Sequence, residues 1–222
     1  MFNKVLVAED LDSISISVVQ ALKELSVGEI HHAKYCDEAF LKIKKAILEK
    51  KEYDLLISDL SFKPDHNQNS LTTGEELINA VKKTQPEIKT IVFSIEDKSF
   101  RIKSLFENSG INAYISKGRN SIPQLKSAIQ EVFNNGKNII SPELSHILSH
   151  KSLIEIEAYD ISLLKLLSKG MILDEIALSL KKEEIAPNSH SSIEKRINKL
   201  KINFKANNNV QLIAITKDLG LI

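Results

Sequence analysis

Residues 1–135 alternate short apolar runs with longer amphipathic stretches, and this alternation restricts the fold more than any other feature of the sequence. The apolar runs have strand length: Lys4–Ala8, Ile30–Ala33, Leu55–Asp59, Thr90–Ser94 and Ala113–Ser116. The stretches between and after them have apolar residues at helical spacing: Ser13–Leu25, Cys36–Glu49, Gly74–Lys83, Lys98–Asn108 and Ile122–Asn134. Strands that alternate with helices are typical of a parallel sheet covered by helices. We therefore predict a doubly wound α/β domain with a five-stranded parallel sheet.

A different pattern follows the helix-stop signal Asn134-Asn135-Gly136. A polar connection with a short helix near Leu144–Leu148 leads to stretches of helical periodicity, which are Asp160–Ser168, Leu173–Leu180, Ser191–Phe204 and Val210–Leu219. We expect residues 1–136 to form the α/β domain, residues 137–154 to be a linker with a short helix, and residues 155–222 to form a small all-α domain.

Composition limits the partners and the compartment. Lys and Arg total 30 against 29 Asp and Glu, so the net charge of +1 offers no overall attraction to nucleic acid, and any such binding must be local. No uncharged apolar run approaches the roughly 20 residues that span a bilayer. The single cysteine and a start without an apolar signal segment favour a reducing compartment. We expect a cytoplasmic protein that does not bind membranes.

Acidic and polar residues follow the predicted strands, at the edge of a parallel sheet where functional groups gather. Glu9 and Asp10 end the first strand, Asp59 the third and Ser94 the fourth, while Lys117 ends the fifth. Clustered carboxylates favour a divalent cation with oxygen ligands, and Mg²⁺ is the ion that we expect. With a lysine and a hydroxyl to match its charge, an aspartate here could carry a phosphoryl group.

These residues resemble the receiver domain of bacterial two-component response regulators over about Met1 to Gly136. The resemblance implies a flavodoxin-like fold and assigns each role: Asp59 as phosphoacceptor, Glu9, Asp10, Asp59 and the carbonyl of Ser61 as the Mg²⁺ site, and Ser94, Tyr114 and Lys117 as the switch. The sequence departs from the family pattern in a longer loop after Asp59 and in the bulky Ile95, which we expect to crowd the path to the phosphoryl group.

The helical domain contains a basic segment. Five basic residues and no acid lie between Lys195 and Lys205, and the apolar stripe of the same helix leaves the cations on exposed positions. A helix that enters the DNA major groove needs such a face, because cations neutralise phosphates and short polar groups at its start reach base edges. The candidate DNA contacts are Ser189, Ser191, Ser192, Lys195, Arg196 and Lys199.

The segment from about Glu155 to Ile222 resembles the LuxR-type helix-turn-helix of the NarL/FixJ response regulators. The motif Glu175-Ile176-Ala177 followed by Ser192-Ile193 and Leu200 carries this resemblance. It implies that Val210–Leu219 packs a homodimer on double-stranded DNA. Arg196 stands where many relatives have histidine.

The two resemblances together predict a transcriptional regulator, not an enzyme, that is phosphorylated by a histidine kinase. A magnesium-dependent phosphohydrolase of the haloacid dehalogenase type is the enzymatic alternative, but its general-acid aspartate would have to stand where this chain has Ser61. The other alternative is an interaction protein that dimerises and binds DNA without phosphorylation. His31 and His32 are interpreted as surface residues, and Cys36 as a structural thiol.

Overall fold

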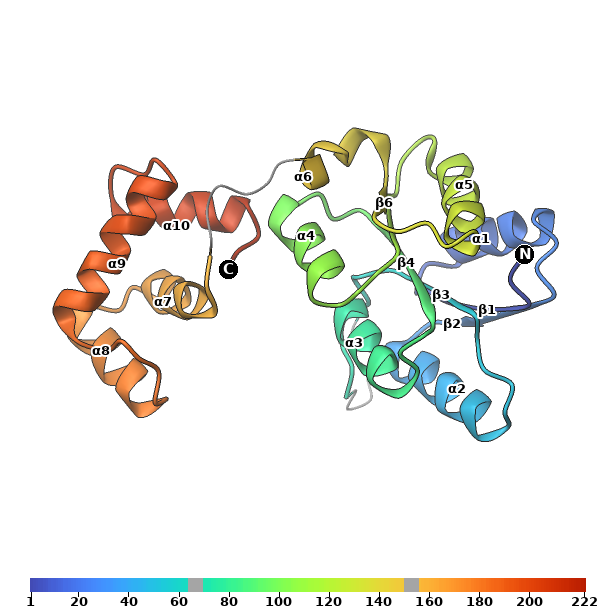
Figure 1. The fold of residues 1–222 in the computed structure, drawn as a ribbon, viewed down its shortest axis with the longest axis horizontal. Coiled ribbons are helices and arrows are strands. Elements are labelled where there is room, and N and C mark those ends of the chain that lie inside the picture. The colour runs from blue at the N-terminus through green and yellow to red at the C-terminus, as the bar shows by residue number, and fades with distance from the viewer. Residues whose placement is uncertain (64–69, 150–155) are drawn as a thin grey trace. The chain divides into compact units, whose positions relative to one another are not determined.

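The computed structural model describes residues 1–63, 70–149 and 156–222, and Figure 1 shows its ribbon. The chain divides into two compact units. One contains Met1–Asp97 and Ile102–Ser149, and the other contains Lys98–Arg101 and His150–Ile222. Each unit has its own hydrophobic core.

A parallel sheet forms the centre of the first unit, as the alternating sequence pattern predicts. Its strand order is β2-β1-β3-β4-β5-β6. The strands are β1 (Lys4–Ala8), β2 (Glu29–Ala33), β3 (Leu55–Ser58), β4 (Lys89–Ser94), β5 (Ala113–Ser116) and β6 (Ile139–Ile140). Because β2 and β3 lie on opposite sides of β1, the order reverses between β1 and β3, and this is the position at which doubly wound sheets bind ligands.

The predicted number of five strands is wrong, because β6 adds a sixth within the described residues. Its two residues are too few to show a periodic pattern, so no strand could be predicted there. The strand forms because the amide of Ile139 donates to the carbonyl of Asn112 at 3.1 Å and the amide of Ser141 donates to that of Tyr114 at 3.0 Å.

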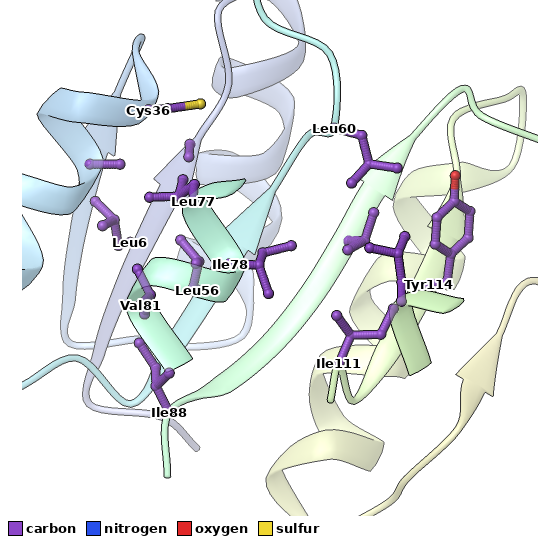
Figure 2. Packing of buried hydrophobic residues seen from close by; sticks show 14 of the residues in the cluster. Leu6, Cys36, Leu56, Leu60, Leu77, Ile78, Val81, Ile88, Ile111 and Tyr114 are labelled. Carbon is purple, nitrogen blue, oxygen red and sulfur yellow. The ribbon is translucent and has the colours of Figure 1, made fainter. Parts of the chain in front are cut away.

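Helices cover both faces of the sheet (Figure 1). α1 (Asp12–Glu24) and α5 (Ser121–Phe133) pack on one face, and α2 (Cys36–Leu48), α3 (Gly74–Thr84) and α4 (Ser99–Glu107) pack on the other. Figure 2 shows the core beneath α2, α3 and α4, in which strand residues meet apolar residues of the helices. Successive strand residues point to opposite faces, which is why β3, buried on both faces, has the consecutive apolar residues Leu55, Leu56 and Ile57.

The segment that follows β6 folds onto the first unit. It forms a short 3₁₀ helix (Pro142–Leu144) and α6 (His146–Ser149). Leu144 and Ile147 are buried in the core that α2, α3 and α4 cover. Burial of these two apolar side chains holds residues 142–149 of the expected linker, with its short helix, against the first unit. Residues 150–154 lie outside the described residues.

The C-terminal unit is helical, as expected. Its helices are α7 (Ala158–Ser168), α8 (Leu173–Lys182), α9 (His190–Asn203) and α10 (Asn209–Asp218). Their apolar stripes enclose one core, in which Leu163, Ile176, Ile197 and Leu212 are buried. Among the residues that the structure describes, no helix combines the length and the apolar character needed to cross a membrane.

Candidate functional site

Three carboxylates meet where the strand order of the sheet reverses. Ala8 of β1 pairs with Ser58 of β3, so the residues that follow these strands, Glu9 and Asp59, leave the sheet side by side. Single carboxylate oxygens of Glu9, Asp10 and Asp59 all lie within 4.8 Å of one another. Glu9 and Asp59 are buried and Asp10 is half-buried. The sheet thus brings together the carboxylates that strand-end reasoning selected.

This donor set fits Mg²⁺, because it offers three carboxylates in a space small enough for one ion. Ser61, the fourth predicted ligand, lies beside the cluster: its amide is 3.4 Å from Oδ1 of Asp59. The amide of Lys63 donates to Oδ2 of Asp10 at 3.2 Å. Asp10 and Ser61 are the more exposed members of the set, so the site faces solvent on their side.

Lys117 joins two of the carboxylates. Its ammonium lies 2.6 Å from Oδ2 of Asp59 and 2.7 Å from Oε2 of Glu9. The other oxygen of Asp59, Oδ1, accepts the amide of Leu60 at 2.6 Å. Both oxygens of Asp59 are therefore held, which fixes the orientation of its carboxylate.

Glu9 has an unusual environment among these acids. Burial raises the pKa of Glu9, and the hydrogen bond and positive charge of Lys117 act against this increase. The backbone carbonyl oxygen of Glu9 lies 2.8 Å from Nε2 of His32, which is hydrogen-bond distance. His32 is half-buried. The interpretation of His32 as a mere surface residue missed this contact, because the pairing of β1 with β2 that creates it is not visible in the local sequence.

The predicted switch residues lie on β4 and β5, next to the acidic cluster. Ser94 is fully buried, and its hydroxyl has no hydrogen-bond partner among the described residues. Tyr114 is also fully buried, and its hydroxyl donates to the carbonyl of Glu96 at 2.6 Å. Ile95, in contrast, is 73% exposed. The expected crowding of the path to the phosphoryl group by Ile95 stays a prediction.

Gly74 was not singled out from the sequence, although it contacts the predicted phosphoacceptor. It is the first residue of α3, and a Cβ atom built on it would lie 1.8 Å from the carbonyl oxygen of Asp59. Its amide donates to the carbonyl of Leu60 at 3.0 Å. Only glycine permits this close approach. The sequence signal that could have identified Gly74 is its position directly after Thr73, the residue that caps α3.

Cys36 is buried at the start of α2, as expected for a structural thiol. Burial, with a smaller contribution from the charge of Asp37, raises the pKa of Cys36 to about 12. The thiol therefore stays protonated at neutral pH and is a poor nucleophile.

The predicted DNA-contacting residues lie on α9 or at its start. Ser189 caps the helix, and its hydroxyl accepts the amide of Ser192 at 3.3 Å. Ser191, Lys195 and Lys199 are exposed. These positions are compatible with a contact face on α9.

Arg196 has a different environment from the other members of that set. Its Nε donates to Oδ1 of the buried Asp160 at 2.5 Å, and its Nη2 lies 2.6 Å from Oδ2 of Asp160 and 2.9 Å from Oε1 of Glu157. The expectation of an exposed position for Arg196 is wrong, because its guanidinium is bound to α7 and to the residue before it. Its contact with DNA stays a prediction.

Neither a protein-family model nor a curated protein matches this sequence. Solved structures do match. A structure of the RcsB response regulator of Salmonella typhimurium, described as showing conformational dynamism for DNA interaction, is 18% identical with a TM-score of 0.68, and the match covers 97% of this chain and 99% of that one. A structure of the two-component response regulator RcsB in complex with DNA is 18% identical, covers 98% of each chain and has a TM-score of 0.62.

The first unit matches separately. The isolated REC domain of RcsB from Salmonella enterica serovar Typhimurium, with the phosphomimetic BeF3⁻, is 19% identical with a TM-score of 0.50 over 65% of this chain and 97% of that one. At these identities the comparisons establish a shared fold, which is an α/β receiver-like unit followed by a helical unit.

Proposed function

We propose that this chain is a DNA-binding response regulator of transcription, in which a histidine kinase phosphorylates Asp59 and thereby controls the C-terminal unit. The observation that carries the proposal is the position of the Lys117 ammonium between Asp59 and Glu9, in a cluster of three carboxylates that fits one divalent cation. The full-length match in fold to a DNA-bound response regulator supports it.

The arrangement suits phosphoryl transfer to Asp59. A carboxylate oxygen of Asp59 attacks phosphorus, a new P–O bond forms, and the P–N bond to the kinase histidine breaks with its electron pair kept by the imidazole. Lys117 moves from neutralising the carboxylate to neutralising a phosphoryl oxygen. Glu9, Asp10, Asp59 and the Ser61 carbonyl would hold Mg²⁺, and its positive charge would offset the added negative charge.

The switch then depends on Ser94. Its buried hydroxyl lacks a partner in the described structure, so a phosphoryl oxygen on Asp59 offers it a hydrogen bond. Movement of Ser94 toward the phosphoryl group vacates space beside β4 and β5, which the ring of Tyr114 can enter. The surface around these strands therefore differs between the two states, and this difference shifts a dimerisation or domain-release equilibrium.

The C-terminal unit supplies the DNA contacts in this proposal. Ser189, Ser191, Ser192, Lys195 and Lys199 lie along α9 or at its start, where short polar groups meet base edges and lysines meet phosphates. Two copies bind one double-stranded site, with α10 as the packing helix.

Phosphorylation of the full-length chain tests the proposal. Incubation with Mg²⁺ and acetyl phosphate should add one phosphoryl group, which mass spectrometry locates on Asp59. Asp59→Asn should remain unlabelled, whereas Asp97→Asn, at an exposed position, should be labelled as the wild type is. Label on Asp59→Asn would refute the assignment of the acceptor. A wild-type chain that takes no label but binds DNA would support the alternative, a regulator that works without phosphorylation.

A further inference from the structure

A second candidate site lies at the sheet edge opposite to the acidic cluster. The connections that lead into β4, β5 and β6 line a half-open pocket of about 290 Å³. Its wall includes Lys82, Lys89, Lys137, Phe106 and Asn112. Because the strands are parallel, these connections precede the strands, whereas Glu9, Asp59 and Lys117 follow them. The pocket is therefore separate from the proposed phosphorylation site.

The pocket has an excess of positive charge. It is lined by three lysines, Lys82, Lys89 and Lys137, and by one acidic residue, Glu87. The net charge of these four side chains is +2, whereas the net charge of the whole chain is +1. No carboxylate forms an ion pair with the three lysines among residues 1–63, 70–149 and 156–222. A local excess of cations that the protein itself leaves uncompensated favours an anionic ligand.

The positive charges of Lys82 and Lys89 repel each other, and this is seen in the pKa of Lys82. Its ammonium is half-buried and donates to the carbonyl of Ile88 at 2.6 Å. Burial lowers the pKa of Lys82, the positive charge of Lys89 lowers it further, and Glu87 acts in the opposite direction. An anion bound between Lys82 and Lys89 would relieve this repulsion.

The remaining wall of the pocket is apolar or neutral. Ile88 and Ile111 belong to the core of the first unit and lie just before β4 and β5 (Figure 2). The partly buried ring of Phe106 packs against the same core. An apolar wall beside a cluster of ammonium groups suits a ligand that has one strongly anionic end and one compact organic part.

We propose that this pocket binds a small organic phosphate, in which a phosphomonoester dianion lies among Lys82, Lys89 and Lys137 and a planar or apolar group contacts Phe106. The charge of −2 matches the excess of +2 among the lining side chains. The volume lies at the lower end of the range of about 300–1,000 Å³ that is usual for ligand pockets, which limits the ligand to about the size of a mononucleotide.

Titration of the full-length chain with AMP tests the proposal, with adenosine as the uncharged comparison. EDTA is present throughout, so that phosphate cannot bind to the acidic cluster through a divalent cation. We expect AMP to bind and to shift the backbone amide resonances of Gly110, Asn112 and Lys137. Adenosine should bind at least about ten-fold more weakly, because it lacks the charge-assisted hydrogen bonds.

The variant Lys89→Gln/Lys137→Gln should weaken AMP binding about ten-fold or more. Lys82 is left unchanged, because its hydrogen bond to Ile88 has a structural role. The matched control is Lys23→Gln/Lys51→Gln, which removes the same charge from two exposed positions outside the pocket wall and should bind AMP as the wild type does. Absence of AMP binding at millimolar concentration, equal binding of adenosine, or unchanged affinity in Lys89→Gln/Lys137→Gln would each overturn the proposal.

Discussion

The guanidinium of Arg196 holds the buried carboxylate of Asp160 through two hydrogen bonds, from Nε to Oδ1 at 2.5 Å and from Nη2 to Oδ2 at 2.6 Å. Asp160 is 0% exposed and the Arg196 side chain is 19% exposed. The pair connects α7 to α9, and Asp160 also accepts the amide of Glu157 at 2.9 Å. Arg196, which the sequence predicts as a DNA contact, thus also holds in place the helix that carries the other candidate contacts.

Loss of this pair should destabilise the C-terminal unit. Arg196→Ala leaves a buried carboxylate without its cation, and removal of one partner of a buried pair costs about 3–5 kcal/mol. Hydrogen exchange measured by mass spectrometry on the full-length chain should show a drop of this order in the opening free energy of peptides from α7 and α9. Lys195→Ala, at the exposed neighbouring position, is the matched control and should change little. Equal protection in both variants would mean that the pair contributes nothing to stability.

Lys195 and Lys199 should contribute to DNA affinity. If each contacts a phosphate, Lys195→Ala or Lys199→Ala weakens binding to all sequences alike and flattens the dependence of log K on log salt by about one unit. Fluorescence anisotropy with duplex DNA at several salt concentrations measures both quantities. Lys165→Ala, which removes an exposed lysine from α7, should leave them unchanged. Similar slopes for all three variants would exclude the proposed contact face.

Gly74→Ala should disturb the phosphoacceptor. The new methyl group would meet the carbonyl of Asp59, so α3 or the strand end must move, at a cost of about 1–3 kcal/mol in the free energy of unfolding. Phosphoryl uptake from acetyl phosphate should fall as well. Gly118→Ala is the control, because a Cβ atom there meets nothing within 4 Å although the residue follows Lys117 directly. Urea unfolding and mass spectrometry measure the two effects, and normal uptake by Gly74→Ala would show that its contact does not position Asp59.

Ser94→Ala should stabilise the unphosphorylated chain while weakening its response. Removal of a buried hydroxyl without a partner raises the free energy of unfolding by about 1 kcal/mol. Ser58→Ala, which removes a buried hydroxyl that donates to the carbonyl of Asp59 at 2.7 Å, should lower it by a similar amount. Urea unfolding in EDTA compares the two variants. Destabilisation of both would contradict the assignment of Ser94 as a residue without a partner in this state.

The same Ser94→Ala variant tests the switch. Sedimentation and DNA affinity are measured in Mg²⁺, once with beryllium fluoride and once without it. Both quantities should differ between these two conditions in the wild type and differ less in Ser94→Ala. Identical wild-type values in both conditions would show that phosphorylation does not control this chain.

The acidic cluster could be predicted from the sequence because the parallel α/β pattern alone brings strand ends together. Glu9, Asp59 and Lys117 each follow an apolar run, and the sheet places Lys117 within hydrogen-bond distance of both carboxylates. The fold class follows from the same periodicity and is confirmed by the order of the strands.

The features that the sequence did not predict are the partial burial of Arg196, the contact of Gly74 and the strand β6, and each depends on a partner that is distant in the sequence. Arg196 occupies an exposed phase of an isolated helix, and only the packing of α7 against α9 supplies Asp160, 36 positions earlier. Gly74 contacts Asp59 across a long loop, and β6 is too short to have a period of its own. Local patterns cannot reveal such contacts, because the tertiary arrangement creates them.

The short strand β6 also affects how two copies can associate. Its pairing, together with the hydrogen bond from the amide of Ser116 to the hydroxyl of Ser141 at 2.9 Å, occupies backbone groups along the outer side of β5. Such groups would otherwise be a template for a strand from another molecule. The outer side of β5 is therefore closed, and the edge on that side is the two-residue strand β6. Because so short an edge offers few backbone groups, we expect a pairing of two receiver-like units on that side to use mainly helix surfaces and side chains. Association through side chains can be made and broken by a change in packing, whereas a continuous intermolecular sheet would be far harder to reverse.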